Sequence, residues 1–575
     1  MAFQLSPGVN VSEIDLTTIV PAVGTTEGAY VGRFQWGPIN EITTISNEIE
    51  LVSTFGKPDT NTYLDFFTAA NFLAYARNLK LVRVANTSIA NNATSGTRRV
   101  LVENNNEYVT EYSDLSANGE IGMFAARYAG ELGNSLKVSL YANTINTLTT
   151  SWVANTWTYA PEFDGPPSTS TYAANVNGKD DEMHLIVIDE DGAFTGRANT
   201  ILEKFAFMSK AFDAKNDDGS SNYYVNVIND KSQYIYILNK ALDANGVANT
   251  TTWGNTASNT TFTQGLPKYE SSLSGGVSGV VSDANRITGY DLFSNADEVD
   301  ISLIMTGAAN STVVKHVIDN IVTVRKDCVA FLSPEFSDVV NKSGLEANNV
   351  IDYRNTSIAR STSYAVMDSS WKYQFDKYNN VYRWVPCNGD VAGLCVRTDF
   401  ERDPWYSPAG FNRGQLKNVV KLSYNPDKAD RDDLYKNGIN PIVTFRGEGT
   451  VLFGDKTLQA KPSAFDRINV RRLFIVLEKA IARAAKYSLF EFNDAFTRAQ
   501  FVALVEPFLR DVQGRRGIFD FRVVCDETNN TPEVIDRNEF VGDIYIKPAR
   551  SINFIQLNFV AVRTGVAFDE IVGRF

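Results

Sequence analysis

The segment "EVDISLIMTGAANSTVVKHVIDNIVTVRKDCVAFLSP", residues 298–334, decides the fold class. Its two ends are short apolar runs bounded by turn residues, a pattern that predicts strands. Between these ends, apolar residues recur at helical spacing, at Val313, Val317, Ile321 and Val324. A helix between two strands indicates layered α/β packing.

The same alternation occurs closer to the N-terminus. "AYVGRFQWGPINE" (29–41) holds a short strand and a Gly-Pro turn, and "LKLVRVA" (79–85) is typical of a buried strand. Between them, "TYLDFFTAANFLAYARN" (62–78) has the spacing of a helix. We therefore predict one α/β domain made of residues 26–92 together with residues 275–400.

The rest of the chain divides into three regions. Residues 1–25 alternate apolar and polar side chains imperfectly, which predicts an extended N-terminal arm. Residues 93–274 are rich in Thr, Asn, Ser, Gly and Tyr, which predicts one or more β-rich inserted outer domains, with long loops as the alternative. Residues 401–575 hold the strongest helix, Asp466 to Phe490, and end in strands, which predicts a C-terminal α+β core domain.

The composition excludes several classes of function. The chain has 575 residues, a net charge of -13 and a pI of about 4.9, which argues against nucleic acid as a main partner, because phosphate contacts need a basic surface. The sequence shows neither a long apolar run nor the start of a secretory signal, so we expect neither membrane insertion nor secretion. The cysteines form no CxxC pair and are expected to be reduced and structural: Cys328, Cys387, Cys395 and Cys525.

The sequence predicts no catalytic, cofactor or metal site. The two histidines, His184 and His316, are accompanied by neither a GxSxG nor an HExxH motif, and we expect both to be structural. The phosphate-binding motif GxxxxGK[ST] does not occur. Gly447 and Gly449 lack the third glycine of a dinucleotide site, so we predict a turn.

One helical segment carries an asymmetric charge. In "DRINVRRLFIVLEKAIARAAKYSLFEFND" (466–494), apolar residues form a single stripe. Four cations fall within an arc of roughly 60° on the opposite side of the helix. They are Arg472, Lys479, Arg483 and Lys486. This face is either solvated and paired locally, or it docks on an acidic partner surface, where charge complementarity sets register and association rate.

Six stretches, in the same order, resemble the tail sheath proteins of contractile-tailed bacteriophages, especially the long T-even-like kind. They are "PGVNVSEID" (7–15) followed by "AYVGRFQWGPINE" (29–41), "YAGELGNSLKV" (128–138), "LSGGVSG" (273–279), "VPCNGDVAGLCVRTDFERDPWYSPAG" (385–410), "INPIVTFRGEGTVLFGDKTL" (439–458) and "INVRRLFIVLEKAIARAAKYSLFEFND" (468–494). One position departs from the family pattern, because the small residue usual before Gly389 is Asn388 here. The resemblance covers most of residues 1–92 and 273–575.

The resemblance implies a fold and a use for both chain ends. It implies a subtilisin-like α/β domain, a C-terminal core domain closer to the tail axis, and inserted domains further out. The likeness to subtilisin is one of fold only, so we expect no peptidase activity. The N-terminal arm and a C-terminal strand at 552–564 would complete a sheet in neighbouring subunits. The residues expected to exchange are Val9, Val11, Ile14, Ile552, Phe554, Ile555, Leu557, Phe559 and Val562.

The resemblance also implies a structural role in the virion tail. Subunits would polymerise as a helical tube of stacked rings around the inner tail tube and contract to drive that tube through the host envelope for genome delivery. The partners would be further copies of the chain, the tube protein, and the baseplate and tail terminator proteins, with no cofactor and with assembly in the host cytoplasm. The basic helix face would touch the tube. Hinges would lie at Pro21, Gly24 and Pro548.

Two other functions fit parts of this sequence. The sheath of a non-phage contractile injection system would share these motifs, and the large Asn/Thr-rich insertion is the feature that favours a phage. A hydrolase that uses the α/β domain is the alternative from a different class. It would need a nucleophile within hydrogen-bond reach of a histidine.

Overall fold

The computed structural model describes residues 24–112, 121–142, 157–238, 252–262, 268–553 and 555–556. These residues form two compact units. The larger unit contains the described residues up to 404 and residues 408–483, and the smaller contains residues 405–407 and the described residues from 484 onward. Among the helices of the described residues, none is both long enough and apolar enough to cross a bilayer.

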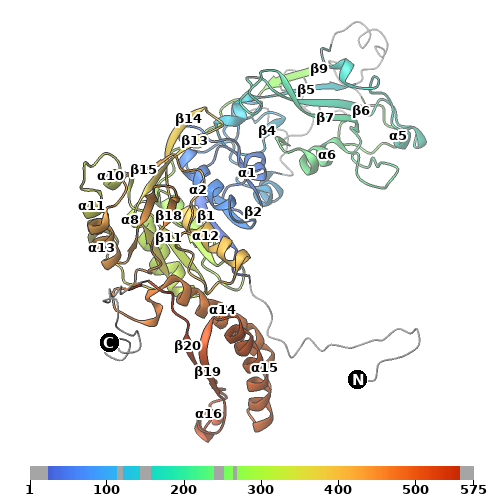
Figure 1. Cartoon of the computed structure of the whole chain (residues 1–575). Helices are drawn as coiled ribbons and strands as arrows, with labels where there is room; N and C mark the ends of the chain where they lie inside the picture. The colour runs from blue at the N-terminus through green and yellow to red at the C-terminus, as the bar shows by residue number, and fades with distance from the viewer. Residues whose placement is uncertain are drawn as a thin grey trace, which may run out of the picture. The chain divides into compact units, whose positions relative to one another are not determined.

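A seven-stranded sheet lies at the centre of the larger unit, in the order β16-β12-β11-β10-β1-β3-β2 (Figure 1). Neighbouring strands are parallel except for β2, which runs antiparallel to β3. The strands are β1 (Gly28–Gly32), β2 (Ile42–Ile45), β3 (Leu79–Arg83), β10 (Leu303–Met305), β11 (Val329–Leu332), β12 (Ala365–Asp368) and β16 (Ile439–Asn440). The strands predicted in 298–334 and 28–92 are present, so the predicted α/β packing is confirmed.

Helices cover both faces of this sheet, because its central strands are apolar on both sides. Tyr30 and Leu81 pack on one face with residues of α1, α2 and α12. Val31 and Val82 pack on the other face with residues of α7, α8, α11 and α13. These helices are α1 (Glu48–Phe55), α2 (Tyr63–Leu73), α7 (Asp283–Asp291), α8 (Ser311–His316), α11 (Glu346–Asp352), α12 (Asn388–Glu401) and α13 (Lys428–Lys436).

The helix predicted between β10 and β11 forms, but its register changes midway. After α8 the chain continues as a π-helix, Val317–Val322, and then as the short α9 (Thr323–Arg325). The predicted core positions Val313, Val317 and Ile321 are buried, whereas Val324 is 67% exposed and Val322 is buried in its place. A π-turn holds more residues than an α-turn, so it rotates the following residues off the predicted stripe.

The larger unit continues beyond the predicted boundary at residue 400, because β16 joins the edge of the main sheet. A hairpin follows it, and the turn predicted at Gly447 and Gly449 is the turn of this hairpin, with φ angles of 84° and 85°. A separate antiparallel sheet has the order β14-β13-β15. The strands are β13 (Trp371–Asp376), β14 (Val381–Pro386), β15 (Lys421–Leu422), β17 (Ile442–Phe445) and β18 (Gly449–Leu452).

Within residues 93–274, the described part of the chain is rich in β-structure. A four-stranded antiparallel sheet has the order β7-β6-β5-β9, and β4 pairs with β8. Short helices connect these strands. The elements are β4 (Phe124–Ala126), β5 (Leu136–Ala142), α5 (Thr171–Asn175), β6 (Glu182–Asp189), β7 (Thr200–Ser209), α6 (Tyr224–Lys231), β8 (Ile235–Ile237) and β9 (Lys268–Ser272).

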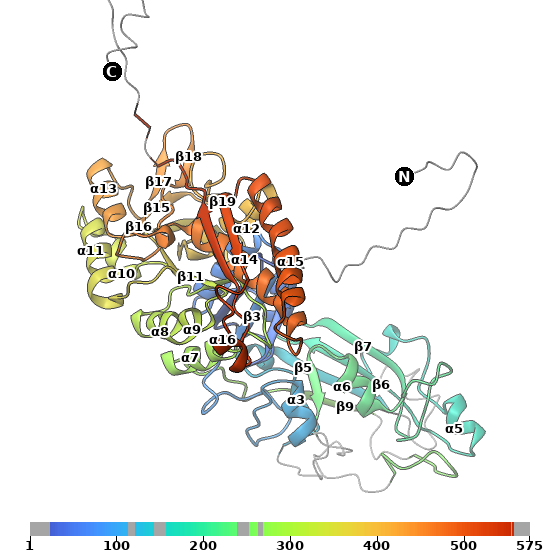
Figure 2. The ribbon, with the colours of Figure 1, turned by 90° about the horizontal axis from the view of Figure 1, so that it is seen from below.

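The smaller unit is built around α15 (Ala495–Gly514) and the antiparallel hairpin of β19 (Ile518–Val524) and β20 (Asp543–Pro548) (Figure 1). Figure 2 shows α15 and β19 from below. Helix α15 is capped by Asp494, whose side chain accepts a hydrogen bond from the backbone N–H of Thr497. It buries Phe501, Val505 and Leu509. Helix α14 (Ile468–Ala485) carries the chain from the larger unit into the smaller one.

Candidate functional site: the arm root and the C-terminal hairpin

A buried ion pair fixes the point at which the predicted N-terminal arm meets the α/β domain. Arg472 on α14 donates to both oxygens of Asp399 on α12, from Nη1 to Oδ1 at 2.8 Å and from Nη2 to Oδ2 at 2.6 Å. Both side chains are 5% exposed. Thr25 Oγ1 donates to Asp399 Oδ2 at 2.7 Å, and the Thr25 carbonyl accepts from Arg472 Nη2 at 3.4 Å. We call Thr25, Asp399 and Arg472 the arm clamp.

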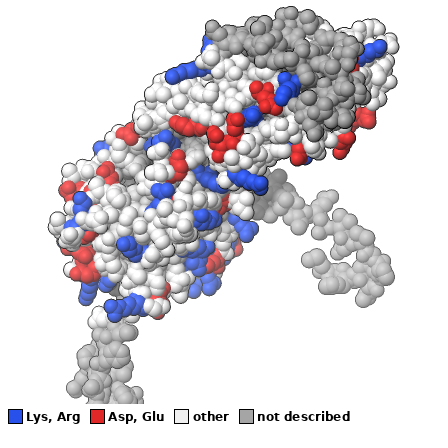
Figure 3. All heavy atoms as spheres, turned by 90° about the horizontal axis from the view of Figure 1, so that it is seen from above, with Lys and Arg blue, Asp and Glu red and all other residues white. Residues whose placement is uncertain are grey.

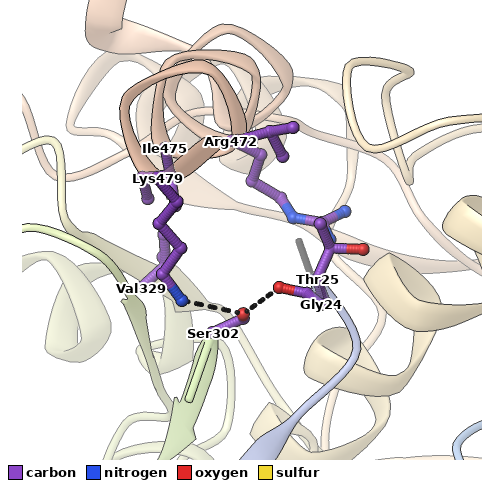
Figure 4. Close-up of a pocket in the computed structure, with 8 residues that line it drawn as sticks. Gly24, Thr25, Ser302, Val329, Arg472, Ile475 and Lys479 are labelled. Atoms are coloured by element: carbon purple, nitrogen blue, oxygen red, sulfur yellow. Dashed lines mark hydrogen bonds between the residues drawn. The ribbon is translucent and has the colours of Figure 1, made fainter. Parts of the chain in front are cut away.

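Gly24 is held beside the arm clamp (Figure 4). Its carbonyl accepts a hydrogen bond from Ser302 Oγ at 3.1 Å, and Lys479 Nζ donates to the same hydroxyl at 3.4 Å. Lys479 also binds Asp300 at 2.9 Å, and Arg483 pairs with the other oxygen of that carboxylate. The cavity between these side chains measures about 10 Å³, room for about one water molecule. The arm root is therefore a packed joint, too small to hold a ligand.

Burial and opposite charge compete at the two carboxylates of this joint. Burial raises the pKa of Asp399, and the guanidinium of Arg472 limits that rise. Burial also acts to raise the pKa of Asp300, but the hydrogen bond and charge of Lys479, followed by those of Arg483, bring it below its ordinary value. Removing one partner of a buried pair leaves the other charge uncompensated, which costs about 3–5 kcal/mol.

The predicted open basic face of α14 is largely occupied within the subunit. Arg472 is buried against Asp399, and the side chain of Lys479 is 9% exposed. Arg483 is paired but its side chain is 42% exposed, and Lys486 is exposed beyond the end of the helix. A free cationic face is therefore wrong for Arg472 and Lys479. The sequence could not show this, because their carboxylate partners lie 73 and 179 residues away.

The C-terminal hairpin has two open edges within the part of the chain that the structure describes. There, β19 and β20 pair with one another from Ile518↔Pro548 to Val524↔Asp543 and with no third strand. Two-stranded sheets are marginally stable alone in water, and open edges are templates for a further strand. Phe519, at a bulge in β19, and Tyr545 of β20 are 70% and 60% exposed. The described hairpin therefore leaves one backbone edge of each strand without a neighbouring strand.

The residues predicted to exchange between subunits are described only in part. Ile552 and Ile555 follow β20 and are 82% and 78% exposed, which suits side chains that bury against a partner. Of the predicted hinges, Gly24 lies at the arm root and Pro548 ends β20. The third predicted hinge, Pro21, lies outside the described residues. So do the remaining predicted exchange residues, which are Val9, Val11, Ile14, Phe554, Leu557, Phe559 and Val562.

The sequence analysis did not predict one exposed apolar surface. Residues 487–496, which we call the aromatic segment, connect the end of α14 to the start of α15. Phe490 has a φ of 71°, in the left-handed region that large side chains avoid. The density of aromatic residues in "YSLFEF", directly after a helix, was the signal that could have revealed it. The exposed apolar side chains are Tyr487 at 78%, Leu489 at 63%, Phe490 at 104%, Phe492 at 84% and Phe496 at 75%.

The described hydrogen-bond partners of the two histidines are a carboxylate, a side-chain amide, a carbonyl and a backbone N–H. His316 Nε2 lies 2.6 Å from Asp291, and its Nδ1 lies 2.8 Å from the side-chain amide of Asn320. His184 bonds to the carbonyl of Gly165 at 2.9 Å and to the N–H of Phe207 at 3.0 Å, and burial lowers its pKa. These groups orient an imidazole but supply no nucleophile.

The carboxyl edge of the main sheet, where open α/β folds usually bind ligands, is filled by side chains. Asn388 Nδ2 donates to the carbonyl of Gly307 at 2.8 Å and to Ser333 Oγ at 3.0 Å. Ser333 Oγ donates to Asp368 Oδ2 at 2.6 Å. All four residues are buried, so the side chain that departs from the family pattern, Asn388, helps to close this edge. The described residues contain no cluster of His, Cys, Asp and Glu that could hold a metal ion.

This buried network makes stability depend on pH through Asp368. Burial raises its pKa to about 8, so the folded protein holds this proton more tightly than the unfolded chain does. The stabilisation is full below about pH 4 and is lost as the pH rises toward 8. We expect the stability of the natural chain, relative to Asp368→Asn, to fall by about 1.4 kcal/mol per pH unit in this window. Urea unfolding of both chains at several pH values measures it, and parallel curves would contradict it.

Known proteins resemble this chain along nearly its whole length. Three family models match the chain: the phage tail sheath protein central domain at 293–458, the phage tail sheath C-terminal domain at 460–561, and the tail sheath protein Gp18 domain III N-terminal region at 28–84. The tail sheath protein of Vibrio phage KVP40 is 36% identical over 99% of this chain and 100% of that protein. The tail sheath protein of Enterobacteria phage T4 is 33% identical over 99% of both.

Solved structures share the fold at low sequence identity. A sheath tail protein of Listeria innocua is 11% identical, with a TM-score of 0.52 over 92% of this chain and 96% of that one. A sheath tail protein of Desulfitobacterium hafniense is also 11% identical, with a TM-score of 0.50 over 95% of this chain and all of that one. With two relatives above 30% identity along the full length, this chain belongs to the phage tail sheath protein family.

Proposed function

We propose that this chain is the structural subunit of a contractile tail sheath, which polymerises around the inner tail tube and contracts to drive that tube through the host envelope. The full-length relationship to phage tail sheath proteins carries this conclusion. The subunit is a component of the virion tail. The baseplate and tail terminator proteins would contact the ends of the polymer. Assembly would take place in the host cytoplasm.

Strand exchange would hold the polymer together. The C-terminal strand at 552–564 and the N-terminal arm, through Val9, Val11 and Ile14, would add strands to the β19–β20 hairpin of neighbouring subunits. The open hairpin edges and the exposed Ile552 and Ile555 support this proposal. Such a contact is heterologous, since donor and acceptor differ, and it therefore generates an open helix.

Contraction would be rigid-body motion about the ends of these connectors. The proposed hinges are Pro21 and Gly24 before the α/β domain and Pro548 after β20. Strand links would persist in both states of the sheath while the surfaces between them repack. The extended sheath would then be a higher-energy state stabilised by the tube, and contraction would release energy as subunits gain contacts.

The contact with the tube would lie on the aromatic segment and on Lys486, the last of the four cations of the predicted basic face. Arg472 and Lys479 are engaged with carboxylates inside the subunit and would have to break buried pairs to reach a partner. The aromatic segment, by contrast, exposes five large apolar side chains, which marks an interaction surface. The inner position that the family resemblance implies for the C-terminal core domain supports this proposal.

No catalytic role accompanies the structural one in this proposal. The larger groove of about 460 Å³ near α2 and β13 is lined by no histidine, cysteine or serine. The parallel sheet with helices on both faces supports kinship with the subtilisin fold, without its chemistry. Acidic and basic side chains are interspersed on the face in Figure 3, which supports the expectation that nucleic acid is not a partner.

Negative-stain micrographs of the purified protein, with and without tail tube, test the proposed function. The expected result is hollow striated tubes, which cover the tube protein in an extended form when it is present. Particles that stay monomeric at concentrations of about 10 μM or more, a range in which specific assembly is easily seen, would contradict it. Hydrolysis of peptide or ester substrates by those particles would favour the enzyme alternative.

A further inference from the structure

We propose that the arm clamp is the mechanical anchor through which tension in the N-terminal arm is transferred to helix α14. This role rests on the strand exchange proposed above. The three residues of the clamp join the arm root to two helices of the α/β domain, since Asp399 lies on α12 and Arg472 on α14. Among the described residues, a pull on the arm would meet the Gly24–Ser302 hydrogen bond and then, one residue later, the clamp.

The chain after the clamp is already part of the sheet. The carbonyl of Glu27 accepts hydrogen bonds from the backbone N–H groups of Ser302 at 2.9 Å and Leu303 at 3.1 Å, and β1 begins at Gly28. Without the clamp, a pull on the arm would load these bonds one after another, starting from Gly24. With the clamp, the load is shared at Thr25 with the two helices.

The chemistry of the clamp suits a permanent load. A guanidinium and a carboxylate joined by two parallel hydrogen bonds resist both displacement and rotation. Because both side chains are 5% exposed, salt in the medium screens the pair little. Helix α14 is also the element through which the chain continues into the smaller unit, which contains the C-terminal hairpin.

Two variants and a matched control test the anchor. Thr25→Val removes only the hydroxyl that reaches Asp399, and Asp399→Asn removes the charge that Arg472 binds. The control is Asp65→Asn, which breaks a comparable pair in the same domain. There Arg286 binds both oxygens of Asp65, at 3.0 Å and 2.8 Å, with side chains 19% and 4% exposed. In the described part of the chain, this second pair forms no hydrogen bond or ion pair with Gly24 or Thr25, so it reports loss of stability.

The measurement is the length of assembled sheaths after a fixed shear, together with the thermal unfolding of each free subunit. Thr25→Val and Asp399→Asn should shorten sheared sheaths by about tenfold or more, the effect of losing one charge-assisted bond. Asp65→Asn should leave the length unchanged even where its subunit is equally destabilised. Thr25→Ser, which keeps the hydroxyl, should restore the natural length.

Sheaths of the clamp variants that are as long as those of the control would overturn the anchor. The chain lacking residues 1–20 separates this failure from failure of strand exchange. If that truncated chain still forms long sheaths, the arm carries no load, and both proposals are wrong. If it forms none while the clamp variants behave like Asp65→Asn, strand exchange stands and only the anchor is wrong.

Discussion

We expect deletion of residues 552–575 to leave a folded subunit that does not polymerise. The main sheet and both of its helical layers lie in the larger unit, which does not include this segment. An added strand of about six residues contributes about five main-chain hydrogen bonds at about 1 kcal/mol each. Burial of Ile552 and Ile555 adds about 1.5–3 kcal/mol for each side chain. The concentration needed for polymerisation should therefore rise by more than about a thousandfold, measured by sedimentation and electron microscopy.

A matched point substitution controls this deletion. Ile552→Ala removes an apolar side chain that is 82% exposed in the subunit, and Ile49→Ala removes one that is 83% exposed on α1. The first should raise the critical concentration about tenfold or more, and the second should leave it unchanged. Equal effects of the two substitutions, or long sheaths formed by the truncated chain, would rule out exchange of the C-terminal strand.

Replacing Phe490 by glycine should stabilise the subunit and at the same time weaken assembly on the tail tube. The backbone at Phe490 has a φ of 71°, a conformation that glycine adopts without strain. Relief of this strain should raise the free energy of unfolding by up to about 1 kcal/mol. Loss of the aromatic side chain from the tube contact should weaken each subunit's binding by about 1.5–3 kcal/mol, or roughly 10–100-fold.

The opposite signs of these two effects separate a binding surface from a structural one. Thermal unfolding of the subunit and the yield of tube-templated sheaths measure them independently. Phe212→Gly is the control, because Phe212 is also exposed, at 59%, but lies in the inserted region. Normal assembly of Phe490→Gly on the tube would show that the aromatic segment faces something else.

Local pattern was sufficient for much of the fold. The α/β alternation around residues 298–334 predicted β10, β11 and the helix between them, and helical spacing at 62–78 predicted α2. These segments are strongly periodic and long enough for packing to follow the pattern. The two-residue β16 had no such signal. It joins the sheet only because the folded chain brings it beside β12, and so the boundary predicted at residue 400 falls short.

The incorrect predictions have a shared physical cause. A contact with a residue distant in sequence cannot be recognised from the local sequence pattern. Arg472 and Lys479 formed part of a regular basic stripe, but Asp399 and Asp300 neutralise them in the folded subunit. In the same way, the periodicity that placed Val324 in the core assumed an uninterrupted α-helix, and the π-helical turn exposes it. The charge asymmetry was real, but Arg472 and Lys479 bind carboxylates beside the arm root.

The proposal gives the arm root and the hairpin separate mechanical roles in the sheath. The connectors must be held firmly where they leave each subunit and be free to turn just beyond that point. The arm clamp would supply the first property at Thr25, and the proposed hinge at Pro21 would supply the second. On the acceptor side, a hairpin with open edges exchanges solvent for a neighbour's strand without refolding.

Hydrogen exchange at residues 552–562 tests the central claim most directly, because it reports main-chain hydrogen bonds formed with a neighbour. The peptide amides of this segment should exchange at least about a hundredfold more slowly in the assembled sheath than in the isolated subunit, as a strand held by several bonds does. Amides of the main sheet, such as those of β1, should exchange equally in both forms. Equal exchange of residues 552–562 in subunit and sheath would contradict strand exchange at the C-terminus.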